Sequence, residues 1–254
     1  MRRRAATILA GLILLLGARH GMATEISATV VEGNETWDAE SSPYVLVADL
    51  TVAKGASLTI APGVEVRLGP DVSLRVQGEL IARGATGAPI LFTNRDPDTL
   101  WGAIVFEPGA ASAVYEDLHD YVSGSVLELV TIEYGQRALR MEGSSPLVRA
   151  CTFQHNRYGS SDQTELSGGA ALWIGADSAP LIDACTFEDN YIQGFPQGGA
   201  VCVEYGEPII KDNLFRGNES NYGGALVTSW VYSPVVGNTF EDNKGRFEGG
   251  GAAF

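Results

Sequence analysis

Apolar residues alternate with polar or small residues over short stretches between positions 44 and 106, as in Val72, Leu74 and Val76. Gly or Pro interrupts these stretches every 6 to 9 residues. Short alternating strands bounded by turn residues predict an all-β domain. The sequence after residue 23 has no stretch of apolar residues at helical spacing, so the pattern excludes an α/β fold.

One six-residue phrase recurs in the second half of the chain. It reads CTFQHN at 151–156, CTFEDN at 185–190, NLFRGN at 213–218 and NTFEDN at 238–243. Its Phe residues are 34, 28 and 25 residues apart, so the core of the unit is fixed while its length varies. This indicates a repeated structural unit with variable loops. The segment 127–135 aligns with the same phrase and has Ile132 in the place of Phe.

Alignment of the units on the Phe produces columns of similar residues. The Phe column holds Ile132, Phe153, Phe187, Phe215 and Phe240, and the column five residues earlier holds Leu127, Val148, Ile182, Ile210 and Val235. The column four residues before the Phe alternates in charge and holds Glu128, Arg149, Asp183 and Lys211, then Val236. Neighbouring strands lie about 4.8 Å apart, where opposite charges attract and like charges repel. The alternation therefore predicts that equivalent residues stack on adjacent parallel strands.

A second repeated element, Gly-Gly-Ala, lies between the phrases at 168–170, 198–200, 223–225 and 250–252. Each unit then has three short strands: one near a Pro, one at the Phe and one after Gly-Gly-Ala. We expect Ala171, Val201 and Leu226 to point inward from the last of these. Three strands per unit, stacked unit on unit, predict a right-handed parallel β-helix. The Asn that ends each phrase is expected at a tight corner, where Asn tolerates positive φ and stacked amides hydrogen-bond between units.

Two parts of the sequence resemble known families. The alternation of FxxN with GGA resembles the repeats of polymorphic outer-membrane proteins, which are surface adhesins. The first half, from SSPYVLVADLTVAKGASLTIAPGVEVRLGPDVSLRVQGELIARGATGAPILFTN to YVSGSVLELVTIEYG, resembles the entry coils of secreted right-handed β-helix repeat proteins, which are similar in fold to pectate lyases. Together the resemblances cover roughly residues 40–254. They imply the fold but not the function, because this architecture hosts lyases, hydrolases, glycan binders and adhesins.

The N-terminus has the order of a secretory signal peptide. Three Arg residues precede the apolar run from Ala5 to Ala18, and small residues follow at 21–23. The run has 14 residues, which is short for a membrane span of about 20, and an uncleaved anchor is the alternative. We expect a signal peptide at 1–23, an N-terminal lead-in at 24–43 and the β-helix at 44–254. The ending EGGGAAF stops inside a unit, so final coils are expected beyond it.

Charge and cysteine content narrow the classes of partner. Without residues 1–23 the chain has 13 basic and 31 acidic residues, a net charge of −18. The phosphates of nucleic acid repel a domain this acidic, so we expect no nucleic acid partner. We also expect no membrane span in the mature segment. Cys151, Cys185 and Cys202 lack metal-ligand spacing. Cys151 and Cys185 share a column at disulfide range, but the required torsion fits flat strands poorly, so we expect two buried thiols.

Aromatic residues are the candidates for ligand binding. Trp173, Tyr205 and Trp230 follow Gly-Gly-Ala elements and are expected near one face. Tyr191 and Tyr222 are expected in loops just after the Asn column. A row of exposed aromatic rings binds sugar rings by stacking on them. Packing in the core or at a corner is the alternative.

Two polar clusters are candidates for other chemistry. In the segment YEDLHDY at 115–121, the side chains of Asp117, His119 and Asp120 suit a metal or acid–base catalysis, with a solvated connecting loop as the alternative. Two later phrases contribute four acids that would suit a weak Ca²⁺ site: Glu188, Asp189, Glu241 and Asp242. The phrase that contains Arg216 lies between these two phrases. We expect no other cofactor and no catalytic set.

These features predict a secreted or surface-displayed protein, without enzymatic activity, that acts in adhesion or glycan binding. Its partner is then an extracellular polysaccharide or a glycan or protein of a cell surface. The rival is a polysaccharide lyase or glycoside hydrolase. That activity requires three or more acids, with an Arg or Lys, on one face without charge alternation. A purely structural segment of a larger surface protein is the third possibility.

Overall fold

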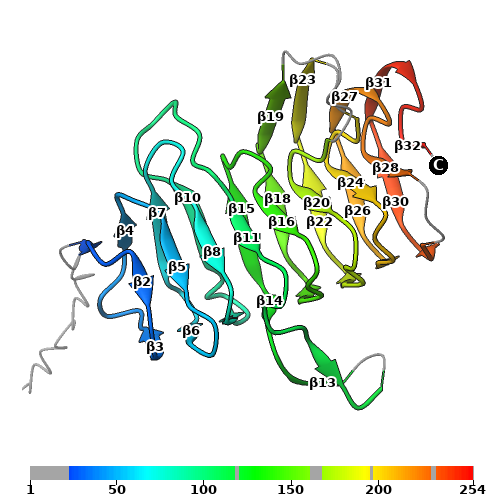
Figure 1. Ribbon diagram of the computed structural model, residues 1–254. Helices are drawn as coiled ribbons and strands as arrows, with labels where there is room; N and C mark the ends of the chain where they lie inside the picture. Colours follow the sequence, from blue (N-terminus) through cyan, green and yellow to red (C-terminus); the bar gives the residue numbers. More distant parts are fainter. Residues whose placement is uncertain (1–22, 118–119, 161–167, 195–196, 230–232, 254) are drawn as a thin grey trace, which may run out of the picture.

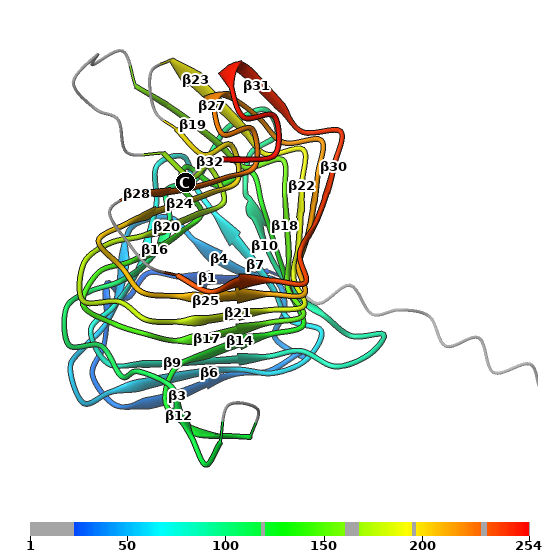
Figure 2. The ribbon, with the colours of Figure 1, turned by 90° about the vertical axis from the view of Figure 1, so that its right-hand side faces the viewer.

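The structure is a computed structural model of the 254-residue chain and describes residues 23–117, 120–160, 168–194, 197–229 and 233–253. The expected signal peptide therefore lies almost wholly outside the described residues. Three sheets of parallel strands wind around one axis, and each coil adds one strand to a sheet before the chain moves to the next (Figures 1 and 2). This part of the chain contains no helix long and apolar enough to cross a membrane.

Two of the sheets contain nine strands each, in chain order along the axis. Sheet A consists of β1 (Thr24–Ile26), β4 (Tyr44–Leu46), β7 (Glu65–Leu68), β10 (Ile90–Asn94), β15 (Val130–Glu133), β18 (Thr152–Gln154), β22 (Thr186–Glu188), β26 (Leu214–Arg216) and β30 (Thr239–Glu241). Sheet B consists of β2 (Val30–Val31), β5 (Leu50–Val52), β8 (Leu74–Val76), β11 (Ile104–Phe106), β16 (Leu139–Met141), β20 (Leu172–Ile174), β24 (Val201–Glu204), β28 (Leu226–Ser229) and β32 (Ala252–Ala253).

The third sheet closes the tube, and two smaller elements lie outside it (Figure 2). Sheet C consists of β3 (Asn34–Trp37), β6 (Ser57–Ile60), β9 (Glu79–Arg83), β14 (Val126–Glu128), β17 (Leu147–Arg149), β21 (Leu181–Asp183), β25 (Ile209–Lys211) and β29 (Val235–Val236). Sheet D, between sheets A and B in the later coils, consists of β19 (Arg157–Ser160), β23 (Tyr191–Gly194), β27 (Glu219–Tyr222) and β31 (Lys244–Glu248). An antiparallel hairpin is formed by β12 (Val114–Tyr115) and β13 (Tyr121–Ser123).

The coiled region begins at Thr24, earlier than the start at Tyr44 that the alternation predicts. The segment expected as a lead-in contains β1, β2 and β3, which are the first strands of sheets A, B and C. Only Val31 and Trp37 among the residues of these strands are buried. A coil at the end of the tube buries few residues, so its sequence lacks the alternation that marks the later coils.

The Phe column lies inside the tube, as the repeat predicts. Ile132 pairs with Phe153, and the column continues with Phe187, Phe215 and Phe240. Centroids of successive Phe rings are 5.0, 4.8 and 4.9 Å apart, and the rings are within 8° of parallel. This spacing matches the distance between neighbouring strands, so each ring fills one level of the core.

A ladder of Asn side chains follows the corner at which the strands of sheet A end. Nδ2 of Asn190 donates to Oδ1 of Asn218 and to the carbonyl of Phe153, each at 2.9 Å. Oδ1 of Asn190 accepts from the backbone N and Nδ2 of Asn156, at 3.1 and 3.0 Å. Asn218 bonds to Asn243 in the same way. The buried amide of Asn190 therefore uses its full hydrogen-bonding capacity, and the predicted bonds between units are confirmed.

The positive φ at this corner belongs to the residue before each Asn, so the expectation that Asn adopts it is wrong. The φ angle is 55° at His155, 52° at Asp189 and 52° at Asp242, and Gly217 takes the place in the remaining coil with 66°. The chain changes direction one residue early because the Asn amide must point into the corner to reach the coils on both sides.

The other Asn column makes a second ladder at the corner between sheets C and A. Nδ2 of Asn213 donates to Oδ1 of Asn238 at 2.8 Å, and its Oδ1 accepts from the backbone N of Cys185 at 2.8 Å. Cys151 and Cys185 occupy this position in the two preceding coils, as buried free thiols whose Sγ atoms donate to backbone carbonyls. Burial raises the pKa of the Cys151 thiol well above its usual value. At this position, two buried thiols thus take the place of the Asn amides and donate to backbone carbonyls as the amides do.

The Gly-Gly-Ala phrases of the first and last units are shifted by one residue relative to the strand pairing of sheet B. Leu172 pairs with Val201, which pairs with Leu226, and Leu226 pairs with Ala252. Leu172 therefore occupies the strand position equivalent to Val201 and Leu226. Ala171, one residue earlier, is fully buried in the same core, in agreement with the expectation that it points inward. The distance from the Gly-Gly-Ala phrase to this column thus varies from unit to unit, and the last unit places Ala252 in it.

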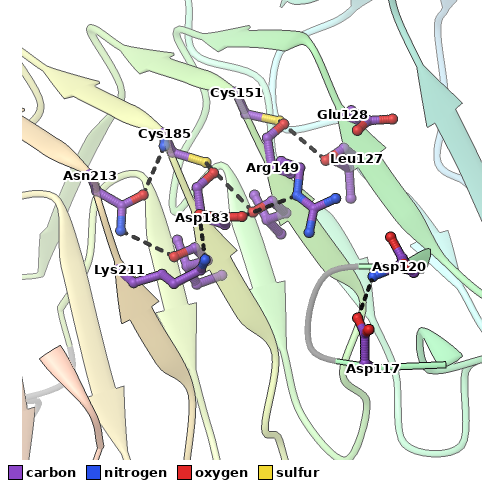
Figure 3. Close-up of polar contacts among 12 residues, drawn as sticks. Asp117, Asp120, Leu127, Glu128, Arg149, Cys151, Asp183, Cys185, Lys211 and Asn213 are labelled. Atoms are coloured by element: carbon purple, nitrogen blue, oxygen red, sulfur yellow. Dashed lines mark hydrogen bonds and ion pairs between the residues drawn. The ribbon is translucent and has the colours of Figure 1, made fainter. Parts of the chain in front are cut away.

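The charged column lies on the outer side of sheet C (Figure 3). Arg149 pairs with Asp183, and Asp183 pairs with Lys211. Arg149 Nε is 3.1 Å from Asp183 Oδ2, and Lys211 Nζ is 3.4 Å from Asp183 Oδ1. Glu128 pairs with Arg149 along the same column and is 2.7 Å from Arg83 of the preceding coil. The stacking predicted from charge alternation is confirmed.

Replacement of Asn190 by Ala should lower the free energy of unfolding by about 3 kcal/mol, because it leaves a buried N–H and a buried carbonyl without partners. Asn190→Asp should cost more, since it buries a negative charge and turns a carboxylate oxygen towards two acceptors, the carbonyl of Phe153 and Oδ1 of Asn218. Denaturant titration measures both values. The control is Asn243→Ala, at a half-buried rung where water replaces the lost bonds, with an expected cost of about 1 kcal/mol. Equal losses at residues 190 and 243 would contradict the ladder's role.

Asp183→Asn should lower the free energy of unfolding by about 2 kcal/mol, because it leaves the cations Arg149 and Lys211 without the carboxylate between them. The three side chains are only 21, 13 and 22% exposed for Arg149, Asp183 and Lys211. In the control, Glu188→Gln removes a carboxylate paired with Arg216, whose side chain is 45% exposed. That change should cost about 0.5 kcal/mol or less. A larger cost for Glu188→Gln than for Asp183→Asn would overturn this ranking.

Candidate functional site

The aromatic residues expected on one face are distributed over several elements. Trp173 lies on the outer side of sheet B, between Arg140 and Cys202 of the neighbouring strands. Tyr205 lies at the corner after β24, where its φ is 61° and its side chain is 66% exposed. Trp230 lies outside the described residues. Trp173 and Tyr205 therefore do not form a row, because one belongs to a strand and the other to a turn.

Tyr191 and Tyr222 lie on strands of sheet D, not in loops as expected. Tyr191 begins β23 and pairs with Arg157 and Glu219. Tyr222 ends β27, and its ring centroid is 5.4 Å from that of Phe247. The sequence pattern missed this fourth sheet because its strands occupy the variable part of each unit. A role of either tyrosine in ligand binding stays a prediction.

The described residues of the segment 115–121 belong to the hairpin β12–β13, which extends away from the tube (Figure 1). Asp117 and Asp120 lie close together in Figure 3, with the backbone N of Asp120 donating to Oδ1 of Asp117 at 3.3 Å. His119 lies outside the described residues. Within the described ranges, no group of three or more His, Cys, Asp or Glu is arranged to hold a metal ion. A chemical role for Asp117, His119 and Asp120 stays a prediction.

The base of this hairpin packs against the outer side of sheet C. Val126, Leu147 and Leu181 form a buried apolar cluster there, with the rings of Tyr115 and Tyr121 against it. Burial raises the pKa of Tyr115 to about 12. The two tyrosines of the YEDLHDY segment thus cover apolar residues that face away from the tube.

The acids considered for Ca²⁺ are separated as the sequence indicates. Arg216 pairs with Glu188 on one side and with Glu241 on the other. Its Nη2 lies 2.6 Å from Glu188 Oε1. The guanidinium therefore takes the place between the two carboxylates that a bound cation would need.

The outer side of sheet B carries a different arrangement, a hollow that we name the sheet-B hollow. It has a volume of about 160 Å³ and lies over β8, β11, β16 and β20, which are neighbours in the sheet. The lining residues are Arg75, Val105, Phe106, Glu107, Pro108, Arg140, Glu142 and Trp173. Because consecutive coils supply these residues, their positions are fixed by the register of the sheet.

Carboxylates follow this side of the sheet without charge alternation. Phe106 pairs with Met141, so the residues that follow them, Glu107 and Glu142, occupy neighbouring positions. The next coil has Gly175 at the equivalent position, and the coil after it has Glu204. Three acids and two arginines thus lie along one side, which is the arrangement that the polysaccharide lyase or glycoside hydrolase alternative requires.

Hydrogen bonds fix the direction of several of these groups. Arg75 Nη1 donates to Glu107 Oε1 at 3.1 Å, and Gln77 Nε2 donates to Glu107 Oε2 at 2.8 Å. Trp173 Nε1 donates to Glu204 Oε2 at 3.0 Å. The indole and the Glu107 carboxylate are therefore held in place before a ligand arrives, which reduces the entropy lost on binding.

Arg140 is the cation of the hollow closest to the indole. Its guanidinium carbon is 5.5 Å from the ring centre of Trp173, a cation–π arrangement. Burial lowers the pKa of Arg140 from its ordinary value, and the nearby Arg137 lowers it further while Glu142 raises it. Arg140 Nε is buried and has no hydrogen-bond partner among the described residues. Such a donor favours a ligand that brings an acceptor oxygen.

An aromatic ring, guanidinium groups and carboxylates together suit a sugar. The ring stacks on the apolar face of the sugar, while the charged groups bond its hydroxyls. The hollow is smaller than the roughly 300–1,000 Å³ of pockets that enclose drug-sized ligands. It therefore holds about one ring, and a longer chain would continue along the sheet.

Of the residues in the hollow, only Trp173 was found from the sequence. Arg75, Glu107, Arg140 and Glu142 were missed because the alignment was built on the Phe phrase, which marks sheet A. A signal was present in FEPG at 106–109, MEG at 141–143 and VEYG at 203–206. In each, an inward apolar residue is followed by Glu and then a turn with Gly, so the Glu must end a strand on its outer side.

Comparison with known proteins agrees with this architecture. The family model described as "Right handed beta helix region" matches residues 117–253, more than half of the chain. Searches of the curated proteins and of the solved structures found no match to this chain. The finer resemblance to polymorphic outer-membrane proteins stays a resemblance. With its parallel sheets, stacked Phe column and this match, the chain belongs to the right-handed β-helix family.

Proposed function

We propose that the protein is a secreted or surface-displayed carbohydrate-binding protein that holds a sugar ring in the sheet-B hollow without cleaving it. The observation that carries this proposal is the arrangement around Trp173. Its indole N–H is bonded to Glu204, and Arg140 lies against the ring with a buried Nε that lacks a partner in the described residues. A fixed ring beside an unused donor is complementary to a sugar with an exposed oxygen.

The sequence supports the extracellular location. Residues 1–23 have the basic, apolar and small segments of a secretory leader. A polysaccharide or a cell-surface glycan is the ligand that such a location offers, and the adhesive role follows from binding it. The net charge of −14 for the whole chain favours solubility and opposes contact with nucleic acid.

One observation favours the alternative of a glycoside hydrolase at the same hollow. Glu107 and Glu142 lie on adjacent coils, and strands are about 4.8 Å apart. Retaining hydrolases place two carboxyl groups about 5–5.5 Å apart, one as nucleophile and one as acid. In this alternative, Glu107 is the nucleophile, because Arg75 and Gln77 orient it, and the exposed Glu142 is the acid.

Trp173→Ala should weaken binding to the recognised polysaccharide about tenfold, which corresponds to about 1.4 kcal/mol, because it removes the stacking surface. Calorimetry against a panel of extracellular polysaccharides identifies the ligand and measures the loss. Tyr205→Ala is the matched control, since it removes an exposed aromatic ring outside the hollow and should leave the affinity unchanged. The proposal fails if the unmodified protein binds no member of the panel, or if both variants bind as it does.

Incubation with the same panel should yield no new reducing ends and no unsaturated products, because the hollow is proposed to bind only. Any turnover would contradict the binding-only proposal. Glu142→Gln then decides whether the hollow is responsible. Loss of turnover with retained affinity would establish the hydrolase alternative at this site, and unchanged turnover would place the activity elsewhere.

A further inference from the structure

A second hollow crosses the tube near the corner between sheets A and B. It has a volume of about 630 Å³ and its lining residues are Asn94, Arg95, Pro97, Asp98, Thr99, Leu100, Tyr134 and Arg157. We name it the cross groove. The lining residues belong to the loop after β10, to the residue that follows β15 in the next coil, and to the start of β19 in the coil after that.

The cross groove exists because a short coil lies between two long ones. Phe92, Ile132, Phe153 and Phe187 are equivalent positions in successive coils. From these residue numbers, the steps are 40, 21 and 34 residues. The middle coil turns directly from sheet A to sheet B, whereas the preceding coil forms a loop there and the following coil adds β19. The groove is thus formed by the chain lengths and needs no conformational change.

Both sides of the cross groove are fixed by hydrogen bonds. Asn94 Nδ2 donates to the carbonyls of Asp96 and Thr99, each at 3.0 Å, which closes the loop. Trp101 at the end of this loop is fully buried, and its Nε1 donates to the carbonyl of Glu133 at 2.7 Å. The loop is therefore anchored to the coil that forms the floor, as expected of a preformed site.

Arg157 gives the groove its charge. Most other arginines on the outer surface are neutralised, Arg140 of the sheet-B hollow being an exception. A carboxylate lies 3.1 Å or less from Arg67, Arg75, Arg83, Arg95, Arg149, Arg216 and Arg246. Arg157 forms no ion pair with any residue in the described ranges. Its exposed guanidinium instead lies 5.7 Å from the ring centre of Tyr191. An acidic chain that leaves this cation without a carboxylate partner in the described ranges, at the edge of a hollow of about 630 Å³, offers it to an anion.

The floor adds a flat surface. The Tyr134 ring is stacked on that of His155, with centroids 5.8 Å apart and planes 18° apart. A ring fixed in this way can support the face of a planar or cyclic ligand. Of the remaining charges, Arg95 is paired with Asp96 at 2.7 Å, and the exposed Asp98 opposes an anion from the loop side.

We propose that the cross groove binds an oxyanion, a carboxylate or sulfate carried on a cyclic ligand, with Arg157 as its charged partner and Tyr134 as the supporting surface. The site is distinct from the sheet-B hollow and uses none of its residues. Because one exposed cation supplies the attraction, binding weakens as ionic strength rises. Asp98 limits the affinity, since its carboxylate repels the ligand across the groove.

The test compares a sulfated oligosaccharide, a carboxylated one, their neutral parent and inorganic sulfate by calorimetry at low and physiological salt. We expect at least one charged oligosaccharide to bind and the neutral parent not to bind at this groove. Arg157→Gln should weaken this binding at least tenfold, Arg157→Lys should weaken it less, and Asp98→Asn should strengthen it. Inorganic sulfate as tight as the oligosaccharide would identify a free anion as the ligand of the same site.

Two controls make the result decisive. Lys54→Gln removes the same charge from an exposed position outside the groove, so it should leave binding unchanged. Trp173→Ala should also leave it unchanged, which separates this site from the proposed sugar site. Equal losses for Arg157→Gln and Lys54→Gln would overturn the proposal in favour of non-specific attraction. Absence of binding by every anion would overturn it outright, whatever the result at the sheet-B hollow.

Discussion

In-register stacking of one coil on the next is the constraint on which the rest of the structure depends. At the strand spacing of about 4.8 Å, each residue contacts its equivalent in the neighbouring coil. Phe stacks on Phe, and the Asn190 amide bonds to Asn156 and Asn218. The Asn ladder matters most where the chain turns, because backbone groups there lose their sheet partners. A slip of one residue would break the core, the ladder and the charge pairs together.

The same constraint determines where binding sites occur. A regular coil satisfies its own polar groups and leaves a flat surface with little to offer a ligand. The two hollows lie where regularity ends. The cross groove follows from a short coil between longer ones, and the sheet-B hollow is lined by outer side chains of successive coils that do not form an alternating charge column. In both, the framework beneath is rigid, so the residues proposed to contact ligands, such as Trp173 and Arg157, are held by their neighbours.

The sequence predicted what repeats and missed what does not. The Phe column, the alternation of Arg149, Asp183 and Lys211, and the Asn ladder are all periodic, so an alignment revealed them. Sheet D was missed because its strands fall in the variable segments. The place of Leu172 was missed because the Gly-Gly-Ala phrase shifts by one residue relative to the strand register. The hollow was missed because the alignment was built on the Phe phrase of sheet A, so the Glu residues that follow the inward residues of sheet B were not compared.

The outer sides of sheets B and C carry different charge patterns, and this contrast supports the proposal that the binding site lies on sheet B. On sheet C the charges alternate from coil to coil and neutralise one another, which stabilises the stack. On sheet B, Glu107 and Glu142 lie next to each other, and their cations Arg75 and Arg140 come from a different column of the sheet. Arg75 is paired with Glu107 of the next coil at 3.1 Å, but the coil after that adds a second acid, Glu142, beside Glu107 instead of an opposite charge. A local departure from the rule that the same chain obeys elsewhere is what a functional surface requires.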